Sequence, residues 1–313
     1  MNTMKDVQLP HRQIILLVAI LLIFSISSPV FAGFETPTNV NNISDPDINT
    51  AATEYYPSIS PDGLSLYYST PGGTSADIHV ARRPNRYSPF GNASSLDGIN
   101  HSTYYDVAPS VTADGLTMVY YRGDGDVTID SHLMIVNRVS TDVPFENEST
   151  IRELSPNLRD YIGEYEPHIT PDGLTLYFAS HGPGGNANIY RTRRSNRSAA
   201  FAPISAVSAV NTGYHENSPF MTADELTLFF SSNRSGGTGS HDFYMVSRPD
   251  TSTAFSADDV VEVADLNSTY YERSISMTED GTEVFIDSTR SGGSGLTDIW
   301  HSEVILEHCF KQY

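Results

Sequence analysis

Five acidic side chains recur at one position of a repeated segment. Each lies eight residues before an aspartate in a turn motif of the type Ser-Pro-Asp-Gly. The five acids are Glu54, Asp106, Glu164, Glu216 and Glu272. A fold that arranges the repeats around an axis would place these acids in a ring at one mouth. Such a ring would attract cations or, together with aromatic residues, bind the hydroxyls of a sugar.

Tyrosines and arginines accompany the ring acids. The tyrosines expected at the same mouth are Tyr56, Tyr105, Tyr165, Tyr214 and Tyr271. Arg234 and Arg290 lie in Arg-Ser-Gly-Gly loops above the acidic ring, where they would clasp a ligand carboxylate or sugar hydroxyls. Pairing with Glu216 or Glu272 is the favoured alternative. The alternative for the acids is architectural, because buried carboxylates need partners and would accept backbone N–H bonds from their own or the next blade, which would fix the repeat geometry. Both interpretations stay open, and the architectural one is favoured for the acids.

One loop of the second repeat is unusually acidic. It reads Gly123-Asp124-Gly125-Asp126-Val127-Thr128-Ile129-Asp130. The oxygens of Asp124, Asp126 and Asp130 would suit a hard cation such as Ca²⁺, although the loop lacks the bidentate Glu of a complete calcium loop. An exposed acidic turn is the alternative. We expect no other cofactor.

Catalytic motifs of familiar types are missing from the sequence. It contains no Gly-x-Ser-x-Gly, no His-Glu-x-x-His and no phosphate-binding loop. His181, His215 and His241 fall in or beside loops of the third and fourth repeats, where they would converge on a metal or remain ordinary surface residues. Catalysis would require acids in unlike environments, which identical repeats do not provide.

The elements that must position these residues are five copies of one unit. The copies align on Asp62, Asp114, Asp172, Asp224 and Asp280, at spacings of 52, 58, 52 and 56 residues. In a Ser-Pro-Asp-Gly turn, proline pre-sets φ, glycine accepts the positive φ, and aspartate caps the turn through side-chain to backbone bonds. The residues 64–68 (LSLYY) then alternate as in a strand with one buried face.

Each copy continues through a Gly-rich loop to a short third strand and then to a fourth strand that opens with Phe. The fifth copy lacks this last strand. Residues 34–44 (FETPTNVNNIS) match it and precede the first copy. We therefore predict an all-β, five-bladed β-propeller of four-stranded antiparallel blades, in which the N-terminal strand completes the last blade and closes the ring.

The repeat Ser-Pro-Asp-Gly-Leu-x-Leu-Tyr-Phe, followed by Gly-Gly and Asp-Ile-Tyr, resembles the TolB-type, WD-repeat-like propeller repeat of secreted bacterial proteins. The resemblance covers about residues 34–302. This chain departs from it at His132, at Glu225 and at residues 282–284. The resemblance implies a β-propeller that serves as a protein-binding or glycan-associated platform and is usually not catalytic.

The N-terminus predicts export. Lys5 and Arg12 precede an apolar run from Ile14 to Phe24, which is too short to span a bilayer, and Val30-Phe31-Ala32 matches a signal-peptidase site. We expect a signal peptide at residues 1–32, a propeller at 33–303 and a C-terminal tail at 304–313. After cleavage of the signal peptide, the mature chain would be secreted or periplasmic, with no membrane insertion. An uncleaved membrane anchor is the alternative.

The charge composition limits the classes of partner that the protein is expected to bind. With 38 acidic and 18 basic residues the net charge is −20, which argues against nucleic acid because phosphate backbones would be repelled. We expect a monomeric, non-catalytic binding platform for a protein or polysaccharide. The alternative is a carbohydrate-active hydrolase or lyase with asymmetric acids in the central funnel, and a third option is a structural domain of an envelope assembly.

Overall fold

The computed structural model describes residues 31–73, 75–96, 98–123, 132–151, 162–181 and 185–306. Within these ranges the regular structure is β-strand apart from the short 3₁₀ helices η1 (Val40–Ile43) and η3 (Ala257–Asp259). In this part of the chain no helix is long and apolar enough to cross a membrane. Most of the predicted signal peptide, the acidic loop at 124–130 and the end of the predicted tail lie outside the described residues.

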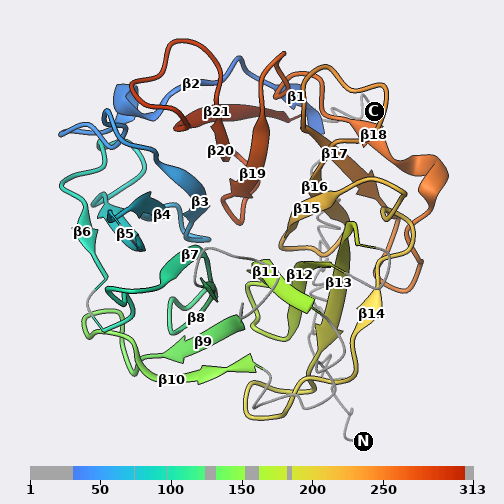
Figure 1. Cartoon of the computed structure of the whole chain (residues 1–313), viewed down its shortest axis with the longest axis horizontal. Coiled ribbons are helices and arrows are strands. Elements are labelled where there is room, and N and C mark those ends of the chain that lie inside the picture. The colour runs from blue at the N-terminus through green and yellow to red at the C-terminus, as the bar shows by residue number, and fades with distance from the viewer. Residues whose placement is uncertain are drawn as a thin grey trace, which may run out of the picture.

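Antiparallel strand units are arranged radially around a common axis (Figure 1). The first unit contains β3 (Tyr55–Ile59), β4 (Ser65–Pro71), β5 (Ala76–Arg82) and β6 (Ser94–Ser95), and the second β7 (Tyr105–Val111), β8 (Thr117–Gly123), β9 (His132–Asn137) and β10 (Glu146–Thr150). The third contains β11 (Ile162–Ile169), β12 (Thr175–His181), β13 (Ala187–Arg193) and β14 (Ser205–Ala206), and the fourth β15 (Glu216–Met221), β16 (Thr227–Ser232), β17 (Asp242–Ser247) and β18 (Val261–Glu262). The last contains β19 (Glu272–Met277), β20 (Glu283–Ser288) and β21 (Asp298–Leu306), to which β1 (Phe31–Phe34) and β2 (Thr38–Asn39) are added.

The aspartate of each repeat caps the turn between the first two strands of its unit, as predicted. Asp172 Oδ1 accepts hydrogen bonds from Thr170 Oγ1 (2.6 Å) and from the backbone N–H of Leu174 (2.9 Å). The same pair of bonds recurs at Asp62, Asp114, Asp224 and Asp280. Gly173 adopts φ +74°, which only glycine reaches without strain.

Both faces of the central strands are buried, which differs from the single buried face expected from alternation. In β4, Leu66 and Tyr68 pack against Phe285 and Ile299 of the last unit, whereas Tyr67 packs against Met118 and other residues of the second unit. The reason is that each sheet stands between two neighbouring sheets. The apolar core is therefore divided into layers between adjacent units, and no unit can bury its surface alone.

The N-terminal segment completes the last unit, as predicted. Strand β2 pairs with β21 through Thr38↔His301 and Asn39↔Trp300, and in Figure 1 the blue N-terminal strands lie beside the red β21. The Asn49 side chain then holds the backbone of Ile299 at both N–H (2.9 Å) and C=O (2.8 Å).

This asparagine clasp is a repeated feature. Asn100 binds Ile78 and Asn267 binds Phe243 at both backbone groups in the same way, and Asn211 does so at Ile189. In those units the asparagine follows its strand in sequence. In the last unit it comes from the opposite end of the chain, so the same contact now ties the N-terminal segment to the C-terminal strand.

Contacts between the last and first units match those within the chain. Ser276 Oγ accepts the N–H of Ile59 (3.0 Å), just as Ser110 Oγ accepts the N–H of Ile169 (3.0 Å). Glu283 adds an ion pair across the same junction, with Arg83 NH2 at 2.7 Å and with Arg86. Burial by itself would raise the pKa of Glu283, but its neighbours His301, Arg83 and Arg86 lower it to about 2.

We expect Glu283→Gln to destabilise the protein by about 3 kcal/mol at pH 7, because that is the free energy equivalent to a pKa lowered from 4.5 to about 2. A lowered carboxyl pKa stabilises the fold fully above pH 4.5, and this stabilisation disappears as the pH falls towards 2. Urea unfolding at pH 7 and at pH 2.5 measures the difference between wild type and variant. Exposed Glu35→Gln is the matched control. A wild-type advantage that does not shrink in acid would contradict the assignment.

Candidate functional site

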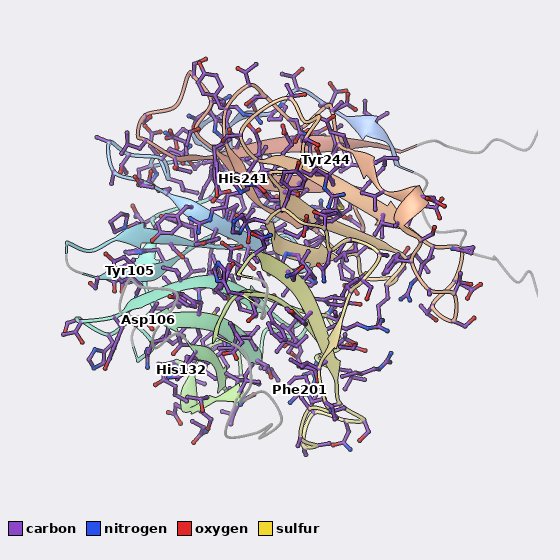
Figure 2. All side chains as sticks on the ribbon, turned by 45° about the vertical axis from the view of Figure 1, so that its right-hand side comes forward. Tyr105, Asp106, His132, Phe201, His241 and Tyr244 are labelled. Carbon is purple, nitrogen blue, oxygen red and sulfur yellow. The ribbon has the colours of Figure 1, made fainter. Side chains whose placement is uncertain are left out.

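A cavity of about 770 Å³ lies on the axis, at the end where the Gly-rich loops gather. We name it the tyrosine cavity. Its lining includes Tyr55, Tyr56, Tyr105, Tyr121, Tyr165, Tyr271, Glu166, Arg273, His181, His215, His241, Asn217 and Asn233. Four of the predicted tyrosines are thus brought together. Figure 2 labels two of these residues, Tyr105 on β7 and His241 just before β17, which come from different units.

A β-bulge in the innermost strand of each unit brings the lining residues to the axis. Consecutive side chains in a regular strand point to opposite faces, yet Tyr55 and Tyr56 both line the cavity, as do Tyr165 and Glu166. The pairing register shifts at each of these positions. Glu166 has φ +51° there, a strained value for a residue with a side chain. The bulge redirects side chains into the cavity.

Glu166 is the only carboxylate among the described residues that line the tyrosine cavity. It is almost fully buried and accepts four hydrogen bonds. Tyr56 Oη donates to Oε1 at 2.6 Å, and Ser218 donates to Oε2 through both N–H and Oγ at 2.8 Å. Arg273 completes the set with an ion pair of 3.0 Å to Oε1 and a bond from Nε at 3.1 Å. Four units of the ring are joined at this point, because these residues come from the first, third, fourth and last units.

The one described carboxylate of the lining is balanced by an arginine. The Arg273 guanidinium, which also stacks 4.4 Å above the Tyr56 ring, balances Glu166. Burial lowers the pKa of His181 and of His241, so both are neutral imidazoles. Burial raises the pKa of Tyr55 and of Tyr271 to about 12, so their hydroxyls keep their protons. Uncharged hydrogen-bonding groups and aromatic rings therefore dominate the surface offered to a ligand.

The ring acids occupy a different place. All five are at most 2% exposed, and none is among the described residues that line the tyrosine cavity. Glu216 accepts bonds from Thr212 N–H (2.9 Å) and Oγ1 (2.5 Å), and Glu272 repeats this with Ser268. Glu54 binds Thr50 in the same way, and Asp106 accepts from His101 N–H and from Arg122. In these four cases the contacts match the architectural interpretation, because the acid fixes the loop that leads into its own unit.

The predicted arginines also serve this arrangement. Arg234 NH2 lies 3.3 Å from Glu216 and Arg290 NH2 lies 3.2 Å from Glu272, so the predicted pairing is confirmed. Each guanidinium also donates to a backbone carbonyl of the loop that leads from the preceding unit into its own, at Val210 or Leu266. Tyr214 is an exposed loop residue, outside the described lining of the tyrosine cavity.

The three histidines do meet at the tyrosine cavity, as the loop positions suggested. The rings of His181 and His215 lie 6.0 Å apart, and His241 packs on Tyr271 at 4.6 Å. Among the described residues, however, no three His, Cys, Asp or Glu side chains are arranged to hold a metal ion. The predicted calcium loop at Asp124, Asp126 and Asp130 lies outside the described residues.

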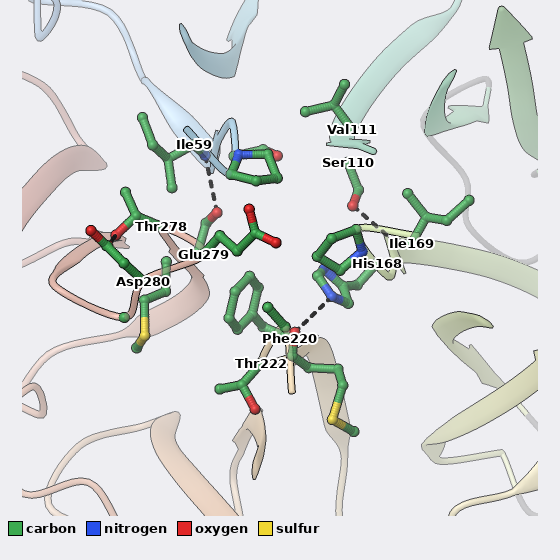
Figure 3. Close-up of a pocket in the computed structure, with 18 of the residues that line it drawn as sticks. Ile59, Ser110, Val111, His168, Ile169, Phe220, Thr222, Thr278, Glu279 and Asp280 are labelled. Carbon is green, nitrogen blue, oxygen red and sulfur yellow. Dashed lines mark hydrogen bonds between the residues drawn. The ribbon is translucent and has the colours of Figure 1, made fainter. Parts of the chain in front are cut away.

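A second cavity, of about 360 Å³, opens at the opposite end of the axis, among the Asp-Gly turns (Figure 3). We name it the turn-face cavity. Apolar residues dominate its lining, including Ile59, Val111, Ile169, Phe220 and Met277. A smaller cavity of about 40 Å³ lies between the two cavities. Its lining includes Pro57, Pro109, Pro167 and Pro219, and it shares Glu166 with the tyrosine cavity and His168 with the turn-face cavity.

Sequence reasoning missed Glu166 and Arg273. They lie one and two residues before the position of Pro167, which is Ile275 in the last repeat. The repeats differ at both places: one residue before are Tyr56, Ala108, Glu166, Ser218 and Ser274, and two residues before are Tyr55, Val107, Tyr165, Asn217 and Arg273. The differences between the repeats at these positions are the sequence feature that would have identified them. The predicted acids were chosen because they recur in every repeat, whereas a binding site on a pseudo-symmetric ring depends on positions that do not.

Solved structures show the same fold at low sequence identity. TolB from Acinetobacter baumannii matches with a TM-score of 0.51 and 17% identity over 89% of this chain, which spans 64% of that TolB chain. An α-L-arabinofuranosidase from Podospora anserina, solved with cellotriose, matches with a TM-score of 0.55 and 9% identity over 89% of this chain and 98% of its own. A thermostable family-43 glycoside hydrolase matches with a TM-score of 0.54 and 14% identity over 84% and 95%. No protein family and no curated protein matches the sequence itself.

The fold class is therefore an all-β propeller, and the predicted resemblance to TolB-type propellers is confirmed at the level of the fold. At these identities the likeness shows architecture alone. Propellers that bind and propellers that hydrolyse share this architecture, so the function must be argued from the lining residues.

We expect Glu272→Gln to destabilise the protein by about 1–3 kcal/mol, because an amide cannot replace a buried carboxylate that accepts from Ser268, Ser288 and Arg290. Ligand affinity should stay unchanged, since Glu272 lies outside the described lining of the tyrosine cavity. Urea unfolding and ligand titration measure the two effects, with exposed Glu146→Gln as control. A stable variant that no longer binds would show that the ring acid contacts the ligand.

Proposed function

We propose that this protein is an exported, five-bladed β-propeller that binds a polysaccharide or protein partner in the tyrosine cavity without catalysing a reaction. Five blades are supported by the five repeats and by the contacts that join the last unit to the first. Export is supported by the N-terminal sequence alone. The observation that carries the binding role is the tyrosine cavity itself, an open aromatic pocket whose one described carboxylate is already neutralised.

The lining favours a polysaccharide over a protein. Aromatic rings such as Tyr105 and Tyr271 offer flat apolar faces to pyranose rings, and their hydroxyls, with Asn217 and Asn233, offer hydrogen bonds to sugar hydroxyls. The volume of about 770 Å³ lies within the usual range of ligand sites. Arg273 keeps N–H groups beyond the two that bind Glu166, and these are available to a sugar oxygen.

The alternative is a carbohydrate-active hydrolase. Glu166 favours it in one respect, because it breaks the symmetry of the ring as a catalytic acid would. Glycosidases generally need two carboxylates on either side of the scissile bond. Glu166 is the single described carboxylate in the lining, and Arg273, Tyr56 and Ser218 already bind both of its oxygens. The contacts therefore favour a positioning role for Glu166 over proton transfer.

Binding is tested with a panel of neutral and acidic polysaccharides and their oligosaccharides by calorimetry. For the ligand that binds, we expect Tyr271→Ala and Tyr105→Ala each to weaken affinity roughly five- to tenfold, because an aromatic contact contributes about 1 kcal/mol. Tyr87→Ala is the control, since Tyr87 is fully exposed outside the described lining of the cavity. Equal loss in the control would contradict the site.

Catalysis is tested on the same panel by measuring new reducing ends or unsaturated products. We expect no product from the wild type. If product forms and Glu166→Gln abolishes it while the variant still folds and binds, the protein is a hydrolase or lyase and the non-catalytic proposal is wrong.

A further inference from the structure

The turn-face cavity differs from the tyrosine cavity in its chemistry. Its wall is built from one apolar residue of each repeat, the third before the anchor aspartate. These residues are Ile59, Val111, Ile169, Met221 and Met277, all buried. Because the wall presents methyl and thioether groups, the cavity suits the apolar part of a ligand.

The residue before each wall residue differs between the repeats. Three repeats have serine at this position, and two of these serines, Ser110 and Ser276, bind the backbone of the next unit. The third and fourth repeats have His168 and Phe220, whose rings lie 4.6 Å apart. His168 Nε2 lies 3.1 Å from the carbonyl oxygen of Met221, and burial lowers the pKa of His168 to about 4. The His168 imidazole is therefore uncharged at neutral pH, and together with the ring of Phe220 it forms an aromatic side of the cavity.

The mouth carries one free carboxylate. The residue before the anchor aspartate is Pro61, Ala113, Pro171 or Ala223 in four repeats and Glu279 in the last. Glu279 is exposed, and Figure 3 shows its side chain directed over the cavity. Its backbone N–H donates to the Pro61 carbonyl, but its carboxylate makes no hydrogen bond or ion pair with the described residues.

The other acids at this mouth are already occupied. Asp224 accepts from Thr222 and Leu226, and Asp280 accepts from Thr278 and pairs with Arg86. They nevertheless leave the mouth negative. An anionic ligand would be repelled here, and a neutral one would leave Glu279 unused.

We propose that the turn-face cavity is a second binding site, and that its ligand is a small organic cation with an aromatic or branched apolar body. The apolar body lies against the aliphatic wall beside Phe220, and the ammonium group pairs with Glu279 at the mouth. The ring of Phe220 adds a cation–π attraction where the ammonium approaches its face. This site lies at the opposite end of the axis from the tyrosine cavity, and it does not depend on the function proposed there.

The test uses three probes of one shape and different charge: phenethylammonium, 2-phenylethanol and 3-phenylpropionate. Calorimetry or ligand-observed NMR with the full chain at pH 7 measures their affinities. We expect phenethylammonium to bind roughly five- to tenfold more tightly than 2-phenylethanol, and 3-phenylpropionate not to bind. Equal affinity for the cation and the alcohol, or no binding of either, would overturn the proposal.

Variants locate the site. Glu279→Ala installs the residue that the second and fourth repeats carry, so the turn should fold normally while the preference for the cation over the alcohol disappears. Phe220→Leu should weaken both ligands, with unfolding measured in parallel to confirm the fold. Glu35→Ala removes the same charge from an exposed site elsewhere and should change nothing. If Glu35→Ala reduces cation binding as much as Glu279→Ala does, the attraction comes from net charge and the site is refuted.

Discussion

The structure depends on one constraint: every sheet must bury both of its faces against a neighbour. Strand β4 shows this directly, because Tyr67 packs towards the second unit while Leu66 and Tyr68 pack towards the last. A linear stack would leave two end sheets with an apolar face in water. Closing the stack into a ring removes both ends, and the contacts of Ser276 and Glu283 with the first unit repeat or extend those made elsewhere in the ring.

The ring explains why recurrent and variable residues have different roles. The ring acids are all buried, and Glu54, Asp106, Glu216 and Glu272 each hold the loop that leads from the preceding unit into their own, which explains why an acid recurs at this position. The bulge recurs as well, and it turns two consecutive side chains of each innermost strand towards the axis. The residue types at these two positions differ between units. The cluster of Glu166, Arg273, Tyr56 and Ser218 arises because unlike residues at two adjacent positions of the repeat meet at the axis.

The two ends of the axis also differ in their chemistry because of residues that vary between the units. At the loop end, the variable positions supply tyrosines, histidines and one balanced ion pair. At the turn end, His168, Phe220 and Glu279 replace residues that other repeats use for structure. A small cavity lined by prolines lies between the two ends. A single scaffold thus offers a polar, aromatic pocket and an apolar pocket with an acidic mouth.

The repeat, the capped turns, the all-β propeller class and the strand pairing of the N-terminal segment with the last unit could be predicted from the residues, because these features follow from local turn chemistry and from counting strands. The pairing of Arg234 and Arg290 with Glu216 and Glu272 could be predicted as well. Which residues face the axis could not, because this depends on contacts between units. A strand without a bulge would have sent Glu166 away from Tyr165, and nothing local to residues 165–166 reveals that Arg273, more than a hundred residues later, lies 3.0 Å from that carboxylate. Side chains from separate repeats converge through the closure of the ring, a long-range consequence of burying every sheet on both faces.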